Sequence, residues 1–258
     1  MKDVDLNRIR NLQLFAGISE PRFAEVTAGA FLQNFPANTT LLYEGDSVDF
    51  LYILIDGCVE LQGTWNDKES TLAILRPIST FILAAVVLDA NALMSARTLE
   101  KSQILMLSAE TLRRTMQEDA NFAVAVAQEV SGCYRGLVRT IKNQKLRNGA
   151  ERLANYLLTL QVRQGGHETV VLPYEKRILA SLLGMTAENL SRAFATLSDY
   201  GVEVTGAEVK ITRPVPLKRL AKPSPLLDNH MLPGQGVTGK AAKEMWPPSD
   251  RSCSAERG

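Results

Sequence analysis

Residues that commonly bind metals or form disulfides are scarce in this chain. Of its 258 residues, two are histidine (His167 and His230) and three are cysteine (Cys58, Cys133 and Cys253). A metal-dependent β-barrel enzyme needs two or three histidines and a carboxylate on its strands, and residues 1–138 contain no histidine. The cysteines are odd in number and far apart, so they predict neither a disulfide framework nor a metal site. The nucleophile motif GxSxG and the phosphate-loop motif GxxxxGKS/T are absent too, so we expect no enzyme.

Long apolar runs are also missing. The longest, FILAAVVL at residues 81–88, is far shorter than the ~18–20 apolar residues of a membrane-spanning helix. The first ten residues, MKDVDLNRIR, are polar and of mixed charge, unlike a secretory signal or a transit peptide. We therefore expect a cytoplasmic protein that does not enter a membrane.

The net charge of +1 hides an asymmetry along the chain. Residues 1–138 contain 11 Lys+Arg and 17 Asp+Glu, whereas residues 139–222 contain 14 and 7, so the two net charges are −6 and +7. Residues 223–258 contain four of each. A basic segment behind an acidic one predicts a polyanionic partner for the second half. Chance clustering of charge is the alternative.

Residues 31–107 have the pattern of an antiparallel β domain. Short apolar runs alternate with turn residues, including Gly45 and Gly57, and this spacing is typical of a sandwich or barrel. Residues 81–88 have no helix breaker and predict a short buried helix inside this β region. Before it, residues 6–30 predict one or two short helices interrupted by Gly17 and Pro21.

A long helix follows the β region. After a short helix at 109–116, residues 121–146 carry one apolar stripe with spacings of three and four: Phe122, Val126, Val130, Cys133, Leu137 and Ile141. Near-heptad spacing favours burial against a second copy of the same helix. We therefore predict a dimer interface made by this stripe. Packing of the helix on its own domain is the alternative.

Residues 150–211 have the pattern of a winged helix-turn-helix. Helices are predicted at 150–162, 174–183 and 187–200, a short strand at 170–172 and a hairpin at 202–211. Ala180 is small enough for a close helix crossing, and Gly184 tolerates the positive φ of the turn. Thr186 is a suitable N-cap for the second helix.

The open face of that second helix carries side chains suited to reading bases. Arg192 can donate two hydrogen bonds to guanine, Glu188 can accept from cytosine, and Ser191 can bond several bases. Further predicted DNA contacts are Thr186 and Ala187 on this helix and, at phosphates, Lys176, Arg177 and Lys210. The alternative for Glu188 and Arg192 is a surface ion pair four residues apart.

The order of β domain, long helix and winged helix-turn-helix resembles the CRP/FNR family of transcriptional regulators. YEGDSVDFLYILIDGCVEL (residues 43–61) resembles its β-roll signature, and GMTAENLSR (184–192) resembles the FNR-type recognition helix. The resemblance implies an α+β protein with an N-terminal double-stranded β-helix (jelly roll) like that of cyclic-nucleotide-binding domains. It also implies a homodimer that reads a palindrome of TTGAT-like half-sites on double-stranded DNA, a small-molecule effector, and contact with RNA polymerase.

The predicted effector region departs from the family pattern. Cyclic-AMP binders hold the ribose and phosphate with Gly-Glu and Arg-Ser pairs, and here Leu83-Ala84-Ala85 and Met94-Ser95 stand in their places. Apolar side chains do not hold a buried anion, so we do not expect cyclic AMP. The pocket we predict, for an uncharged or hydrophobic signal, consists of Leu83, Ala84, Ala85, Met94, Ser95, Cys133 and Tyr134.

Related sensors hold either an iron–sulfur cluster or haem. No cysteine precedes Cys58, so the N-terminal cysteine cluster of FNR iron–sulfur proteins is absent and no such cluster is expected. Haem stays an alternative, with Cys58, Cys133 or Met94 as ligand, although a lone cysteine on an apolar stripe is more often core packing.

We divide the chain into four parts: a β-roll sensor domain (1–118), a dimerisation helix (119–147), a winged helix-turn-helix (148–222) and a tail (223–258) that we expect to be disordered. Within the tail, only residues 226–232 are apolar enough to dock. The rival function is a ligand-binding adaptor of the same architecture that does not read DNA sequence.

Overall fold

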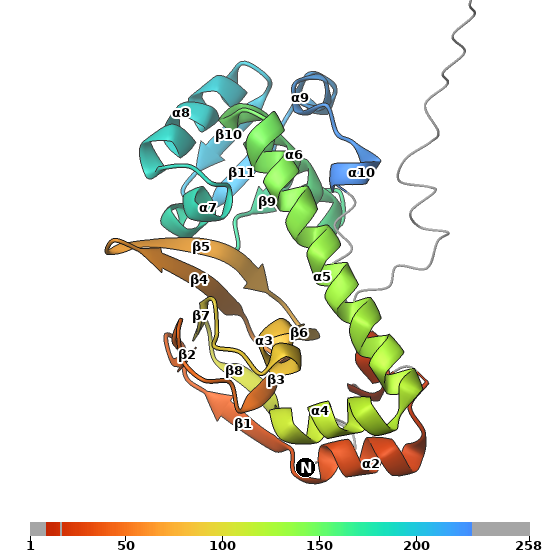
Figure 1. Ribbon diagram of the computed structural model, residues 1–258. Helices are drawn as coiled ribbons and strands as arrows, with labels where there is room; N and C mark the ends of the chain where they lie inside the picture. The colour runs from red at the N-terminus through yellow and green to blue at the C-terminus, as the bar shows by residue number, and fades with distance from the viewer. Residues whose placement is uncertain (1–8, 16, 229–258) are drawn as a thin grey trace, which may run out of the picture.

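The computed structural model describes residues 9–15 and 17–228. His230, Cys253 and the predicted tail beyond residue 228 lie outside these ranges. The chain forms a β domain and a helical C-terminal unit, joined by one long helix, α5 (Ala120–Leu146) (Figure 1). This order of elements confirms the predicted α+β fold with an N-terminal jelly roll and a C-terminal winged helix-turn-helix.

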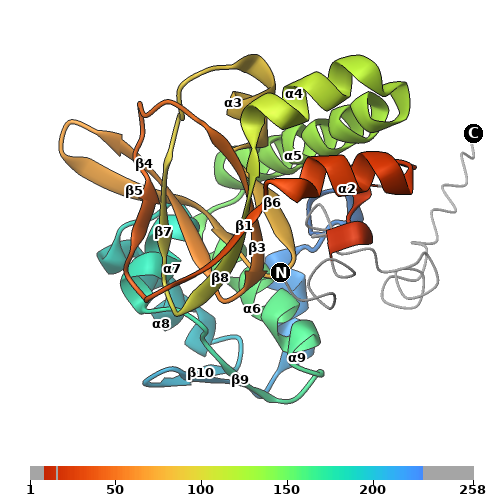
Figure 2. The same ribbon diagram turned by 90° about the horizontal axis from the view of Figure 1, so that it is seen from below.

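Two four-stranded antiparallel sheets make the β domain (Figure 2). One has the order β1-β8-β3-β6 and the other β2-β7-β4-β5. The strands are β1 (Phe31–Phe35), β2 (Thr40–Leu42), β3 (Phe50–Asp56), β4 (Val59–Trp65), β5 (Lys68–Leu75), β6 (Ser79–Phe81), β7 (Ser95–Thr98) and β8 (Ser102–Ser108). The central strand β3 is buried on both faces from Leu51 to Ile55, as expected where helices cover the outer face of a sheet.

A glycine is required where β3 turns into β4. Gly57 has φ +96°, and a Cβ at this position would collide with the backbone of Ser102 on the neighbouring strand. An L-residue would be strained by the positive φ as well as by this close approach. The glycine predicted from the sequence as a turn residue therefore lets the two sheets meet at this edge.

Short helices close the β domain. They are the 3₁₀ turn η1 (Gln13–Phe15), α2 (Glu20–Ala28), α3 (Leu83–Leu88) and α4 (Ala109–Glu118). Phe15 is fully buried and contacts Phe23 of α2 edge-on and Phe122 of α5 in a stacked arrangement. Helix α3 is the short helix predicted within residues 81–88.

The first turns of α5 belong to the core of the β domain. The Asp119 side chain caps the helix by accepting from the backbone N–H groups of Asn121 (2.9 Å) and Phe122 (3.0 Å). Phe122 and Val126 are buried in the chain's own core, and Val130 packs partly against it. The prediction that Phe122 and Val126 face a second subunit is therefore wrong, because both are already covered within one chain. Cys133, Leu137 and Ile141 remain exposed.

The C-terminal unit is a three-helix core with a three-stranded sheet. Its elements are α6 (Gly149–Arg163), β9 (Thr169–Val171), α7 (Lys176–Leu182), α8 (Ala187–Ser198), β10 (Val202–Thr205) and β11 (Glu208–Ile211). The strand order β10-β11-β9 adds the predicted short strand to the predicted hairpin. Asn148 and Glu151 form a capping box that starts α6. Each side chain accepts a hydrogen bond from the backbone N–H of the other residue, so two N–H groups at the start of the helix are paired.

Two further helices follow the wing. α9 (Pro214–Ala221) buries Leu217 and Ala221, and α10 (Pro225–Asp228) packs against α5. Helix α9 was not predicted from the sequence, although Pro214 at its first position and the four-residue spacing of Leu217 and Ala221 are helix signals. Residues 225–228, expected to be disordered, are helical and dock, as the apolar segment from residue 226 suggested.

Candidate DNA-binding interface

The turn between α7 and α8 has the geometry of a helix-turn-helix. Ala180 is buried at the helix crossing, and Gly184 has φ +63°. The N–H groups of Gly184 and Met185 donate to the carbonyl oxygens of Ser181 (2.8 Å) and Ala180 (3.0 Å). Thr186 then caps α8 by accepting from the N–H of Asn189 at 3.2 Å. The small residue, the glycine and the cap lie where the sequence predicted them.

Helix α8 separates its apolar and polar faces. Leu190, Ala193 and Leu197 are buried in the core of the unit. On the other face, Arg192 Nη2 donates to Glu188 Oε1 at 2.5 Å, while their side chains are 73% and 72% exposed. Ser191 is exposed and its Oγ donates to the Ala187 carbonyl at 3.1 Å. The three side chains predicted to read bases therefore meet solvent on one helix face.

The predicted phosphate contacts come from two other elements. Lys176, at the start of α7, lies 5.9 Å from the Phe194 ring, and Lys210 of β11 lies 3.8 Å from a Glu168 carboxylate oxygen. Both are exposed, as phosphate-binding side chains must be. Arg177 is exposed as well, but it borders the β domain. The structure thus places Lys176 and Arg177 on α7 and Lys210 on the wing.

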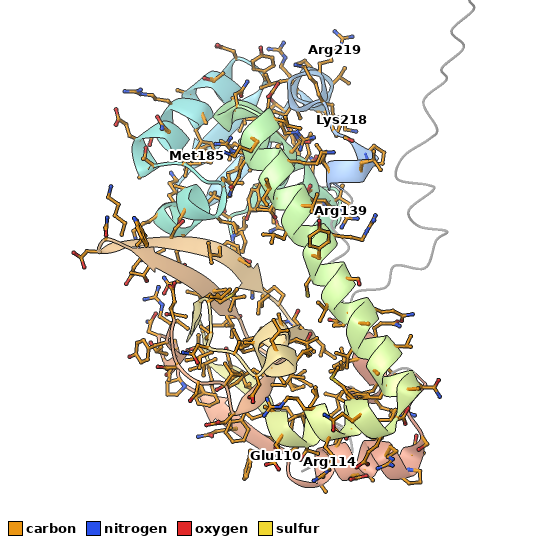
Figure 3. The ribbon with its side chains drawn as sticks, viewed as in Figure 1. Glu110, Arg114, Arg139, Met185, Lys218 and Arg219 are labelled. Atoms are coloured by element: carbon orange, nitrogen blue, oxygen red, sulfur yellow. The ribbon has the colours of Figure 1, made fainter. Side chains whose placement is uncertain are left out.

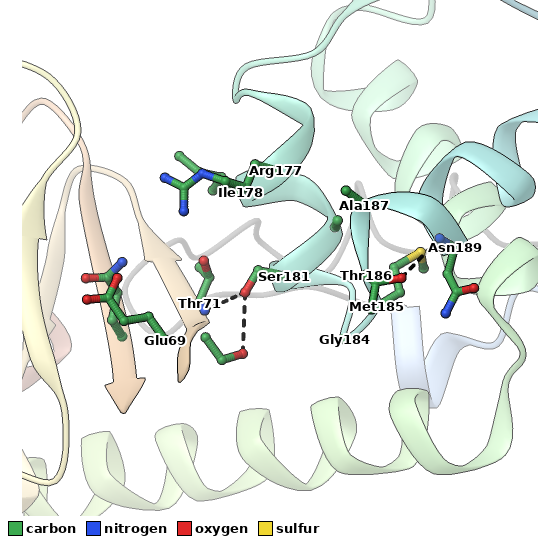
Figure 4. A pocket seen from close by; sticks show the side chains of 13 residues that line it. Glu69, Thr71, Arg177, Ile178, Ser181, Gly184, Met185, Thr186, Ala187 and Asn189 are labelled. Carbon is green, nitrogen blue, oxygen red and sulfur yellow. Dashed lines mark hydrogen bonds between the residues drawn. The ribbon is translucent and has the colours of Figure 1, made fainter. Parts of the chain in front are cut away.

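A cleft separates the start of α8 from the hairpin formed by β4 and β5 (Figure 4). Its volume is about 600 Å³, and Thr186, Ala187 and Asn189 line one wall while Glu69 and Thr71 line the other. At its edge the two domains touch, because Ser181 Oγ of α7 accepts from the Thr71 N–H at 2.6 Å. One end of the predicted recognition helix therefore stands directly across from the β domain.

From this contact, a series of buried hydrogen bonds continues into the sheet β2-β7-β4-β5. Thr71 Oγ1 donates to Glu60 Oε1 at 2.5 Å, and Arg97 Nη2 donates to Glu60 Oε2 at 2.8 Å. The Glu60 side chain is 1% exposed. A buried carboxylate needs such partners because its desolvation is otherwise costly. These bonds thus connect Ser181 of α7 to three strands of the β domain, through Thr71, Glu60 and Arg97.

A second cavity, of about 270 Å³, lies beside this chain. Arg76, Arg97 and Tyr174 help to line it, and the Arg76 guanidinium lies 5.4 Å from the centre of the Tyr174 ring. Cys58 also borders this cavity, and burial raises the pKa of its thiol to about 11. Within the described residues, Arg97 Nε is the buried side-chain nitrogen that has no hydrogen-bond partner.

Arg152 of α6 is a positioning residue that the sequence analysis missed. Its Nη1 donates to the carbonyl oxygens of Arg147 (2.6 Å) and Gln144 (3.3 Å) at the end of α5. Its Nε donates to Leu183 (2.8 Å) and its Nη2 to Gly184 (3.3 Å) in the helix-turn-helix turn. One guanidinium therefore joins the end of the long helix to the turn before α8. No local pattern marks this role.

The exposed part of the α5 stripe forms an apolar face. Leu137 is 58% exposed and Ile141 47%, and Tyr134 and Val138 extend the same surface. Cys133, which is exposed, lies on it too. A face of this kind on one chain is typical of an interaction surface.

The seven residues of the predicted effector pocket are spread over three places. Leu83, Ala84 and Ala85 lie on α3, Met94 and Ser95 lie before and on β7, and Cys133 and Tyr134 lie on the exposed side of α5. Ser95 Oγ accepts from the Glu44 N–H at 2.9 Å. None of the seven lines either interdomain cavity, so the pocket stays a prediction.

Neither a metal cluster nor a membrane-spanning helix is found among the described residues. No group of three or more His, Cys, Asp or Glu side chains in them is placed to hold a metal ion. No helix within residues 9–15 and 17–228 has the length and apolar character that crossing a membrane requires.

Two family models and several known proteins match this architecture. Residues 32–119 match the cyclic nucleotide-binding domain and residues 151–220 match the Crp-like helix-turn-helix domain. The global nitrogen regulator of Nostoc sp. is 22% identical over 76% of this chain and 93% of its own length. The CRP-like cAMP-activated global transcriptional regulator of Mycobacterium tuberculosis is 23% identical over 81% of this chain and 96% of its own length.

Solved structures agree on the fold. FixK2 from Bradyrhizobium japonicum has a TM-score of 0.64 and 18% identity, covering 76% of this chain and 98% of that one. A protein assigned to the crp/fnr family from Eubacterium rectale has a TM-score of 0.68 and 14% identity, covering 81% and 98%. Since the sensor and DNA-binding models both match, in this order and on either side of the long helix, the chain belongs to the CRP/FNR family of DNA-binding transcriptional regulators.

Proposed function

We propose that the protein is a cytoplasmic homodimer that reads a palindrome of TTGAT-like half-sites through Glu188, Ser191 and Arg192. The observation that carries this proposal is the exposure of these three side chains on one face of α8, whose opposite face is buried. The motif GMTAENLSR, with its FNR-type spacing, supports the choice of half-site. Lys176, Arg177 and Lys210 supply positive charge for phosphates on neighbouring elements.

The exposed apolar face of α5 supports the homodimer. Two-fold pairing of Leu137, Ile141 and Tyr134 with the same residues of a second chain would remove this surface from water. Pairing also sets two recognition helices at a fixed separation, about 34 Å for half-sites one DNA turn apart. RNA polymerase is the further partner we propose, on the strength of the family.

The effector we propose is uncharged or hydrophobic, and distinct from cyclic AMP. Residues 77–96, which include the segments in place of the family's Gly-Glu and Arg-Ser pairs, contain no lysine and no arginine. Leu83 and Val86 are buried there and Ala85 is partly buried. A phosphate here would find no cation on this segment, and the neighbouring Arg97 and Arg113 already pair with Glu60 and Asp89.

Coupling between effector and DNA would pass through the Thr71–Ser181 contact. The hairpin of β4 and β5 stands across the cleft from the start of α8, where a DNA backbone must approach if α8 enters the major groove. An effector that favours a state without this contact shifts the population toward DNA binding.

The test is the affinity of the Arg192→Ala variant for a TTGAT palindrome. Loss of one bidentate base contact should cost roughly 1–3 kcal/mol and relax sequence preference at one position of each half-site. Because the Arg192–Glu188 pair is exposed, folding stability should barely change. Lys210→Ala is the matched control, and it should weaken binding to all sequences alike. Unchanged affinity and preference in Arg192→Ala would favour the adaptor that does not read DNA.

A further inference from the structure

The segment after α9 lies across the junction of α5 and α6. Only Arg147 and Asn148 separate these helices, and both have extended backbone conformations. A change in the angle between the long helix and the DNA-binding unit must therefore rotate these two residues. Beyond α9, the chain returns along this junction and forms α10 beside α5 (Figure 1).

A buried ion pair fastens the segment to the junction. Arg147 Nη1 donates to Asp228 Oδ1 at 2.5 Å and Nη2 donates to Asp228 Oδ2 at 2.7 Å. Their side chains are 7% and 6% exposed. Asp228 Oδ2 also accepts from the Ser224 N–H at 2.6 Å, which closes the turn of α10. A two-pronged charged pair of this kind fixes orientation as well as distance.

Further bonds attach the same segment to both helices. On α6, Asn155 Nδ2 donates to the Ala221 carbonyl at 2.6 Å and Glu151 pairs with Lys222 at 3.2 Å. On α5, Arg139 Nε donates to the Leu226 carbonyl at 3.2 Å, and Figure 3 shows Arg139 beside α10. Residues 221–228 therefore bridge the two helices.

The bridge leaves the apolar face of α5 uncovered. Arg139 and Ile141 are two positions apart, so their side chains point about 200° apart around the helix. Ile141 and Leu137 are exposed while α10 lies on the Arg139 side. The bridge and a two-fold pairing of α5 can thus exist together.

We propose that residues 222–228 are a clasp on the α5–α6 junction and that Asp228 is the positioning residue of the DNA-binding unit. Opening the angle would separate Asp228 from Arg147 and leave buried charge without its partner, so the closed clasp opposes the movement. In a dimer the two α5 helices form a common frame, and the clasp then fixes the distance between the recognition helices. This last step rests on the proposed function.

The first test measures the junction alone, in the full chain. Asp228→Asn removes the charge and keeps the shape, and amide exchange of peptides covering residues 143–151 should become roughly tenfold faster or more. Glu110→Gln is the control, because it changes net charge equally at an exposed position of α4 far from the junction (Figure 3). A chain ending at Lys222 should match Asp228→Asn. Wild-type exchange in either clasp variant overturns the proposal.

The second test separates positioning from general stability. Wild type and Asp228→Asn are titrated with DNA carrying one half-site, and with two half-sites at several spacings. The variant should bind the best two-site DNA roughly tenfold more weakly and lose its preference for one spacing, with single-site binding unchanged. Equal weakening on all DNA would indicate general destabilisation and overturn a positioning role. If wild type binds none of these DNAs, the proposed function fails, while the exchange experiment still decides whether the clasp exists.

Discussion

Replacing Arg152 by methionine tests how the helix-turn-helix is held on the long helix. The substitution keeps an apolar stem of similar length and removes the guanidinium. Two short bonds are lost, to the carbonyl oxygens of Arg147 at 2.6 Å and Leu183 at 2.8 Å, with two longer ones at 3.3 Å. Arg152 is partly buried, and this burial lowers the pKa of its guanidinium.

The expected loss follows from these bonds. A hydrogen bond to a charged group contributes about 1.5–3 kcal/mol, so the two short bonds account for roughly 3–6 kcal/mol. The site is partly open to water, and some of the freed carbonyl groups will be hydrated. We therefore expect the free energy of unfolding of the C-terminal unit to fall by about 2–4 kcal/mol.

Hydrogen exchange of the buried α8 amides measures this quantity for the C-terminal unit alone. Arg163→Met is the matched control, because Arg163 lies exposed at the end of the same helix. Its side chain makes no hydrogen bond or ion pair with any of the described residues. Arg152→Lys should recover only part of the loss, since an ammonium cannot reproduce the planar fork. The reasoning is refuted if Arg152→Met changes the stability of the unit no more than Arg163→Met does.

Two more outcomes distinguish the surfaces described above. Leu137→Asp should give a folded monomer in sedimentation experiments, because it places a charge on the exposed face of α5 that we propose as the dimer interface. Val126→Asp should instead unfold the β domain, because it buries the same charge in the core. A dimeric Leu137→Asp protein would contradict the interface. Cys58 should react with iodoacetamide at pH 8 far more slowly in the folded protein than in the unfolded chain, since it is buried and its pKa is raised to about 11. Its labelling should rise as the pH approaches 11. Peptide mass spectrometry measures both rates, and equal rates in the folded and unfolded chain would contradict the burial of Cys58.

Much of the fold could be predicted because its signals are local. The turn glycines Gly57 and Gly184, the Thr186 cap and the apolar periods of α5 and α8 each lie within a few residues of the element they specify. The resemblance of residues 184–192 to a recognition helix also depended on one short segment. Such features survive in a single sequence because backbone conformation and amphipathicity are set by near neighbours.

Only the tertiary structure decided which partner each surface meets. The α5 stripe has one period along its length, yet its first half enters the β domain and its second half stays exposed. Asp228 bonds Arg147, which is 81 positions away in the sequence, and Ser181 bonds Thr71, which is 110 positions away. The amino-acid sequence by itself determined the helices, the strands and the residues of the DNA-facing helix. Contacts between distant segments leave no local period, since they depend on how the finished elements pack together in space.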